Sequence, residues 1–161
     1  MHNKVRFGII GYGKVAALHA KALETTEHAE LVSVSGHRQE RRDAFAHQWG
    51  LNSRNSVEEM IKEDGIQAVV IATPHLQHYS DAFLALNAGC HVLVEKPLAL
   101  SVAEAETLII EANKRNLLLS VIAQRRWYPS CKRIRHAIDE GYLGTPALAQ
   151  LTILGWRDEA Y

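Results

Sequence analysis

Residues 5–23 read VRFGIIGYGKVAALHAKAL, and this stretch decides the fold. Residues 5–10 are mostly apolar and β-forming, which predicts a buried strand, and residues 14–23 have the apolar spacing of a helix. Gly11 and Gly13 stand between the two. A strand that turns sharply into a helix exposes the first amides of that helix, and glycines let a pyrophosphate approach the positive end of its dipole. The alternative is an ordinary turn.

The glycine pattern needs its context before it indicates a ligand. Its form, Gly11-x-Gly13-x-x-Ala16, is loose enough to arise by chance in a chain of this length. The strand before it and the helix after it are those that a dinucleotide fingerprint requires. We therefore predict that this turn binds a nucleotide.

Composition limits the partners of the chain. With 161 residues, 47% of them hydrophobic, the chain is long enough for one well-packed domain. A net charge of zero favours a small-molecule ligand over nucleic acid. We find no signal peptide or membrane span and expect a cytoplasmic protein. Cys90 and Cys131 are predicted to be reduced structural thiols, and no metal site is predicted.

Short apolar runs alternate with longer helical patterns, which is typical of βαβ units and a parallel sheet. Counting to about residue 122, we predict six strands and five connecting helices, which is an α/β fold with a Rossmann-type doubly wound sheet. Ser56 and Ser101 begin capping boxes, each with a glutamate three residues later. The predicted strands with clear bounds cover residues 5–10, 30–35, 67–72, 91–95 and 117–122.

The last part of the chain follows a different pattern. Residues 129–140 predict a helix, and residues 146–154 predict a strand without an obvious partner. We expect a dinucleotide-binding domain over residues 1–125, then a linker helix and the first strand of a truncated α+β substrate domain over residues 126–161. An unpaired strand invites disorder or pairing with another copy, so we expect a possible homo-oligomer through this segment.

The end of the second strand bears on the choice of cofactor. Ligands of open parallel sheets lie outside the carboxyl ends of the strands. Here the second strand ends in Ser35-Gly36-His37-Arg38, without the carboxylate that usually accepts hydrogen bonds from the adenosine ribose of NAD. Arg38 is suited to bind a 2′-phosphate bidentately, which favours NADP. The alternative is that His37 and Arg38 are solvated loop residues.

The end of the fifth strand, Glu95-Lys96-Pro97, is the triplet whose side chains are the strongest candidates for a chemical role. A lysine there, beside a carboxylate able to hold it, stands where a nicotinamide and a hydroxyl-bearing substrate would meet. Lys96 would donate a hydrogen bond to the reacting oxygen. The alternative is a lysine in a surface turn that Pro97 makes rigid.

Four segments together resemble the Gfo/Idh/MocA family of glucose-fructose oxidoreductase, inositol dehydrogenase and rhizopine catabolism proteins, over residues 5 to about 156. They are Gly11-x-Gly13-x-x-Ala16, Thr73-Pro74-x-x-x-His78, Ala88-Gly-Cys-His-Val-Leu-Val-Glu-Lys-Pro97 and Gln124-Arg-Arg-Trp-Tyr-Pro129. The resemblance implies NAD(P)-dependent oxidation of a sugar, cyclitol or related polyol, with Lys96 as a catalytic residue and Pro97 often in a cis peptide. Because family members usually supply the proton-accepting histidine from their second domain, we expect this chain to be inactive alone.

The resemblance and the strand ends together give a set of candidate cofactor-binding residues. At two of them the chain departs from the family pattern, with His75 in place of asparagine and Gly36 in place of aspartate. A non-catalytic NAD(P)-binding sensor is the alternative function, and an S-adenosylmethionine-dependent enzyme is a weaker one. The candidate set is Gly11, Tyr12, Gly13, Lys14, Val15, Ser35, Gly36, His37, Arg38, Ala72, Thr73, Pro74, His75, His78, Glu95, Lys96 and Gln124.

Overall fold

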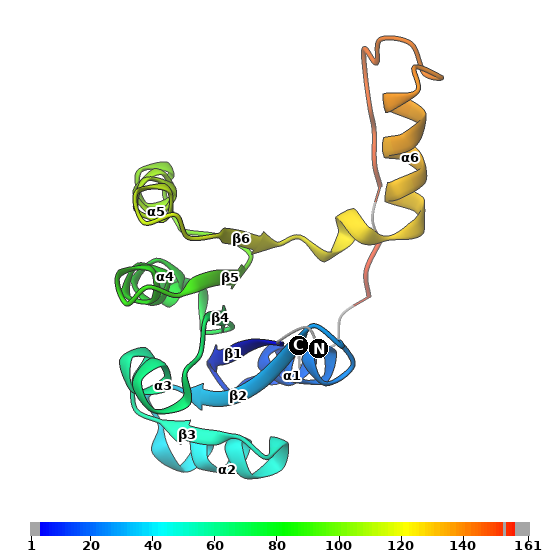
Figure 1. The fold of residues 1–161 in the computed structure, drawn as a ribbon. Helices are drawn as coiled ribbons and strands as arrows, with labels where there is room; N and C mark the ends of the chain where they lie inside the picture. Colours follow the sequence, from blue (N-terminus) through cyan, green and yellow to red (C-terminus); the bar gives the residue numbers. More distant parts are fainter. Residues whose placement is uncertain (1–3, 153, 157–161) are drawn as a thin grey trace. The chain divides into compact units, whose positions relative to one another are not determined.

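A computed structural model describes residues 4–152 and 154–156, and it divides the chain into two compact units, Met1–Ala123 and Gln124–Tyr161. In the described part of the first unit, parallel strands form one sheet in the order β3-β2-β1-β4-β5-β6 (Figure 1). This is the strand order of a Rossmann fold, which confirms the predicted fold class. The strands are β1 (Val5–Ile10), β2 (Ala29–Ser35), β3 (Asn52–Arg54), β4 (Ala68–Ile71), β5 (His91–Glu95) and β6 (Leu119–Ile122).

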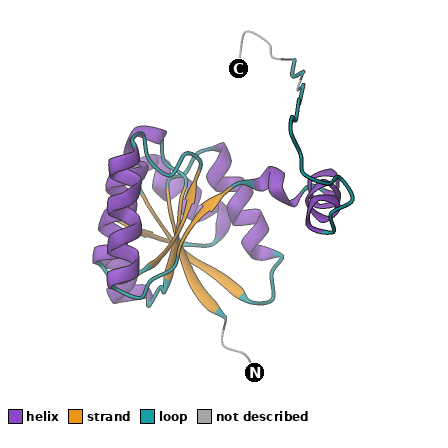
Figure 2. Ribbon diagram, turned by 90° about the horizontal axis from the view of Figure 1, so that it is seen from above, coloured by secondary structure: helices purple, strands orange, loops and turns teal. Residues whose placement is uncertain are grey.

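Helices cover both faces of this sheet (Figure 2). On one face, α1 and α2 bury Ala16, Ala20 and Phe45 against Ile9 and Val34 of the sheet. On the other face, α3, α4 and α5 pack against β4 and β5. All four residues of β4 are buried, because the strand has a neighbour on each side and helices on each face. The helices are α1 (Lys14–Glu24), α2 (Gln39–Trp49), α3 (Val57–Asp64), α4 (His78–Asn87) and α5 (Val102–Lys114).

Local sequence explains where several of these helices begin. The hydroxyl of Ser56 accepts a hydrogen bond from the amide of Glu59 at 3.2 Å, and Ser101 accepts one from Glu104 at the same distance. Both predicted capping boxes are thus formed. By contrast, the N-cap of α1 is Gly13, which has no side chain to offer. The first amides of α1 therefore lack the side-chain cap that begins α3 and α5.

The second unit begins with the 3₁₀ turn η2 (Gln124–Trp127) and continues into α6 (Pro129–Asp139), as predicted to within one residue. The predicted strand over residues 146–154 is wrong: residues 146–152 and 154 are irregular, and residue 153 lies outside the described residues. A strand needs a hydrogen-bonding neighbour to be stable, and this segment pairs with none of the described strands. The assignment of this unit to a substrate domain stays a prediction.

Two further expectations concern the whole described chain. Cys90 is buried and Cys131 is half-buried, and both are free thiols. None of the described helices has the length and apolar character needed to cross a membrane.

Candidate functional site

The turn after β1 is pressed against the chain that leaves β4. The amide of Gly11 donates to the carbonyl of Ser35 at 2.9 Å, which ties the turn to the end of β2. Gly11 has a φ of +109°, and a Cβ there would lie 2.7 Å from the carbonyl oxygen of Ala72. Only glycine is compatible with this backbone conformation and this close approach. The turn therefore brings the ends of β1, β2 and β4 together.

Gly13, unlike Gly11, has open space beside it. It has an ordinary φ of −85°, and a Cβ placed on it would meet nothing within 4 Å. The first turn of α1 contains no acidic side chain, and no side chain of the described residues caps the helix. The open space above Gly13 is thus bordered by uncapped helix amides, which carry the positive end of the helix dipole.

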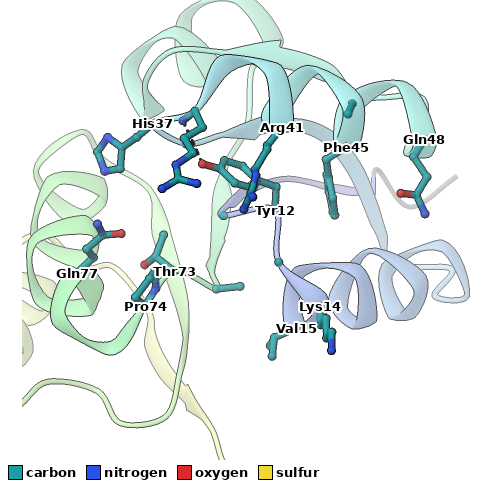
Figure 3. A pocket seen from close by; sticks show the side chains of 16 residues that line it. Tyr12, Lys14, Val15, His37, Arg41, Phe45, Gln48, Thr73, Pro74 and Gln77 are labelled. Carbon is teal, nitrogen blue, oxygen red and sulfur yellow. Dashed lines mark hydrogen bonds between the residues drawn. The ribbon is translucent and has the colours of Figure 1, made fainter. Parts of the chain in front are cut away.

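This space is part of a pocket of about 750 Å³ at the carboxyl ends of β1, β2 and β4. Figure 3 shows side chains of α2 on one side of it, the start of α1 below, and the loop after β4 on the other. Such a pocket is large enough for a cofactor-sized ligand. Its lining is Gly11, Tyr12, Gly13, Lys14, Val15, Gly36, His37, Arg38, Arg41, Ala44, Phe45, Gln48, Ala72, Thr73, Pro74 and Gln77.

The pocket lining is cationic. It contains Lys14, Arg38 and Arg41 and no carboxylate. Neither arginine forms an ion pair with a described residue, so both guanidinium groups are available to an anion. Arg42 differs: it is buried, and it donates to the carbonyl of Gly36 at 3.1 Å. Arg42 thus holds the loop after β2, while the two preceding arginines face the pocket.

Tyr12 joins the two loops that border the pocket. Its hydroxyl accepts a hydrogen bond from the backbone amide of Arg38 at 3.0 Å. Its ring lies against Gly36, where a Cβ would come within 2.5 Å of the ring carbon Cε1. A larger residue at Gly36, such as the aspartate that is usual in the family, would displace the ring in this arrangement. The glycine at this position is therefore matched to the tyrosine.

The loop after β4 is held from behind by α4. Asp81 accepts a hydrogen bond from the hydroxyl of Thr73 at 2.7 Å, and burial raises the pKa of this carboxyl group. His78 is fully buried, with its ring nitrogens 2.6 Å from the carbonyl oxygen of Pro97 and 2.9 Å from that of Thr73. His78 thus supports two loops at this edge of the sheet and has no exposed surface for a ligand.

The turn after β5 contains the triplet that the sequence singled out. The Lys96–Pro97 peptide is cis, and Lys96 is exposed. The expected partnership between Glu95 and the lysine takes another form, because the carboxylate accepts from the backbone amide of Lys96 at 3.2 Å. The other oxygen of Glu95 lies 2.9 Å from Nε2 of His19 on α1. His19 was missing from the predicted site.

Eleven of the seventeen predicted cofactor-binding residues line the pocket. Gln124 belongs to the second unit. The remaining five predicted residues do not line it and are Ser35, His75, His78, Glu95 and Lys96. The pocket also contains five residues that the sequence analysis missed, which are Arg41, Ala44, Phe45, Gln48 and Gln77. Four of these five recur at helical spacing on one face of α2, and this periodicity was the available signal.

The sheet order and the glycine turn at its carboxyl edge define the class, a Rossmann-type nucleotide-binding domain. The family model described as "Oxidoreductase family, NAD-binding Rossmann fold" (GFO_IDH_MocA) matches residues 5–123. The chain belongs to this family of NAD(P)-dependent oxidoreductases, which confirms the resemblance.

Individual relatives agree with this assignment. An oxidoreductase of Formosa agariphila is 33% identical over 160 residues, which cover 98% of this chain and 50% of the relative. Myo-inositol 2-dehydrogenase of Thermotoga maritima is 27% identical, with 92% and 45% covered. The crystal structure of a 3-ketoreductase from Actinomadura kijaniata, in complex with NADP and TDP-benzene, is 30% identical with a TM-score of 0.78, covering 86% of this chain and 43% of its own. The chain thus spans about half the length of these relatives.

Proposed function

We propose that the first unit binds NADP, and that the protein is an NADP-dependent dehydrogenase acting on a CH–OH group of a sugar, cyclitol or related polyol. The observation that supports NADP is that Arg38 and Arg41, in a pocket lining without a carboxylate, form no ion pair with any residue that the structure describes. A 2′-phosphate carries close to two negative charges, and guanidinium groups bind phosphate through charge-assisted hydrogen bonds. Gly36 adds no carboxylate to repel it.

The uncapped start of α1 is the proposed site of the pyrophosphate. The space above Gly13 is open, and no described side chain caps the helix amides beside it. Lys14 lines the same pocket and adds a positive charge. An anion at this position would therefore gain hydrogen bonds from backbone amides together with the favourable helix dipole.

The proposed chemistry places Lys96 at the substrate. A bound nicotinamide would accept a hydride from the carbon that bears the hydroxyl group, and the hydroxyl proton would pass to the histidine that family members usually supply from their second domain. Lys96 would donate a hydrogen bond to that oxygen, and its exposed side chain is free to do so. In the described structure its backbone is held by Glu95, which leaves the ammonium group for the ligand. Relatives named as dehydrogenases of myo-inositol and of glucose 6-phosphate support a polyol or sugar as substrate.

Calorimetric titration with NADP and with NAD tests the cofactor. We expect the wild-type chain to bind NADP at least about tenfold more tightly than NAD, because one charge-assisted hydrogen bond contributes about that factor. Replacing Arg38 and Arg41 together by alanine is expected to abolish the preference while NAD binding changes little. Lys21→Ala is a control for the loss of a positive charge outside the pocket, since it removes one from the opposite end of α1. A preference for NAD in the wild type would contradict the proposal.

A further inference from the structure

We propose that His19 is a positioning residue for Lys96, acting through the carboxylate of Glu95. This inference rests on the proposed function, because it concerns how the turn after β5 meets the nicotinamide end of the cofactor. The three residues come from two elements that are distant in sequence: His19 lies on α1, and the other two end β5 and begin the turn after it.

The contacts form a short chain from α1 to the lysine. Nε2 of His19 is 2.9 Å from one oxygen of Glu95, and since a carboxylate only accepts, this nitrogen is the donor. The other oxygen of Glu95 accepts from the backbone amide of Lys96 at 3.2 Å. The two side chains are only 18% and 15% exposed. The His19–Glu95 hydrogen bond is therefore partly shielded from water, and a shielded hydrogen bond holds its partners more firmly than an exposed one.

The sheet register places this turn next to the pocket. Ile71 of β4 is aligned with Val94 of β5, so Glu95 lies level with Ala72, which lines the pocket. Lys96 itself does not line the pocket. A dinucleotide whose pyrophosphate lies at Gly13 has one half over β2, and its other half would extend across the end of β4 toward this turn.

Helix α1 would thereby serve both halves of the cofactor. Val15 lines the pocket, and His19 is four residues later on the same face of the helix. The helix already packs on the sheet through Ala16 and Ala20, both fully buried, so its attachment does not depend on the histidine. What His19 adds is a specific bond to the turn that presents Lys96.

Two ligands separate positioning from mere packing. The nicotinamide ring of NADP would reach the turn, whereas ADP-ribose 2′-phosphate has the same adenosine, phosphates and riboses without that ring. We expect His19→Ala to weaken NADP binding about tenfold, the value of one shielded hydrogen bond, and to leave ADP-ribose 2′-phosphate within about twofold. His19→Gln, which keeps an N–H donor, should restore most of the loss. His47→Ala, an exposed helical histidine outside the pocket lining, is the matched control.

A second pair of measurements follows the contact chain itself. Glu95→Ala should reproduce the effect of His19→Ala, and the double variant should be no weaker than either single variant, because both remove the same link. In the free protein, the ¹H–¹⁵N signal of the Lys96 amide should move in His19→Ala and stay unchanged in His47→Ala. This signal requires no cofactor.

The outcomes distinguish this inference from the proposed function. If the wild type binds neither ligand, the proposed function fails. In that case, a Lys96 amide ¹H–¹⁵N signal that stays at its wild-type position in His19→Ala would overturn the inference as well. If the wild type binds both ligands and His19→Ala weakens the binding of both equally, the His19–Glu95 contact only attaches α1 to the domain, and the inference is overturned. Unchanged NADP binding in His19→Ala would also overturn it.

Discussion

Gly11 and Gly13 stand two residues apart in one turn, and the structure predicts that alanine at the first impairs stability whereas alanine at the second impairs ligand binding. At Gly11, alanine must adopt a φ of +109° with its Cβ 2.7 Å from a backbone oxygen. The strained backbone costs about 1–3 kcal/mol, and the overlap costs a similar amount because the backbone cannot move aside freely. We therefore expect Gly11→Ala to lower the free energy of unfolding by about 2–6 kcal/mol.

Gly13→Ala should leave stability nearly unchanged. Its φ of −85° suits alanine, and the new Cβ meets nothing within 4 Å. Alanine is a poorer N-cap than glycine, which costs up to about 1 kcal/mol, while the less flexible unfolded chain returns about 0.4–1 kcal/mol. The net change is within about 1 kcal/mol. The added methyl group, however, fills the space where the pyrophosphate would approach the amides of α1.

Urea denaturation and calorimetric titration with NADP measure the two effects separately. Gly13→Ala should unfold at nearly the wild-type midpoint and bind NADP at least about tenfold more weakly, which is the loss of one charge-assisted contact. Gly11→Ala should unfold at a lower urea concentration. Wild-type affinity in Gly13→Ala would refute the phosphate cradle, and an unchanged midpoint in Gly11→Ala would refute the close approach to β4.

Three further predictions concern titratable groups that are buried or half-buried. The hydrogen-bonded ion pair with Arg54 holds the pKa of Asp64 below its ordinary value of 3.8. The stability that this pair contributes is therefore complete above pH 3.8 and is lost as the pH falls through the lowered pKa. Asp64→Asn should cost about 2–3 kcal/mol at neutral pH and flatten the acid side of the profile of melting temperature against pH. Burial raises the pKa of Asp81, so stability should fall as the pH rises from the ordinary pKa of an aspartate up through the raised pKa. Asp81→Asn should remove this fall from the same profile. Burial also raises the pKa of the Cys90 thiol to about 11. Iodoacetamide should therefore alkylate Cys131 at mildly alkaline pH and Cys90 only in denaturant, which mass spectrometry would measure. Modification of Cys90 in the folded protein would contradict its burial.

Periodicity and turn chemistry were enough to predict the fold class of the first unit. The strand–glycine–helix segment, the capping boxes at Ser56 and Ser101, and the alternation of strands and helices depend on residues close in sequence. The predicted strand over residues 146–154 failed for the same reason. Its apolar pattern is compatible with a strand, but a strand also requires a neighbouring backbone, which a local pattern cannot supply.

The candidate site could be predicted in part. Residues of the strand ends, such as Gly13 and Arg38, follow directly from the rule that ligands bind at the carboxyl edge of the sheet. Arg41 was missed because its role depends on which face of α2 borders the pocket. The roles of His78 and Glu95 were also incompletely predicted: the structure buries the first and joins the second to α1.

The sequence by itself determined the class of the fold and the position of the glycine turn, because both arise from short-range conformational preferences and hydrophobic spacing. Tertiary structure alone decided which distant side chains meet. His19 and Glu95 are 76 residues apart in the chain and 2.9 Å apart in space. That contact depends on the strand order, on the register between β4 and β5, and on the face that α1 turns to the sheet. These are properties of the packed domain, in which many long-range contacts form together.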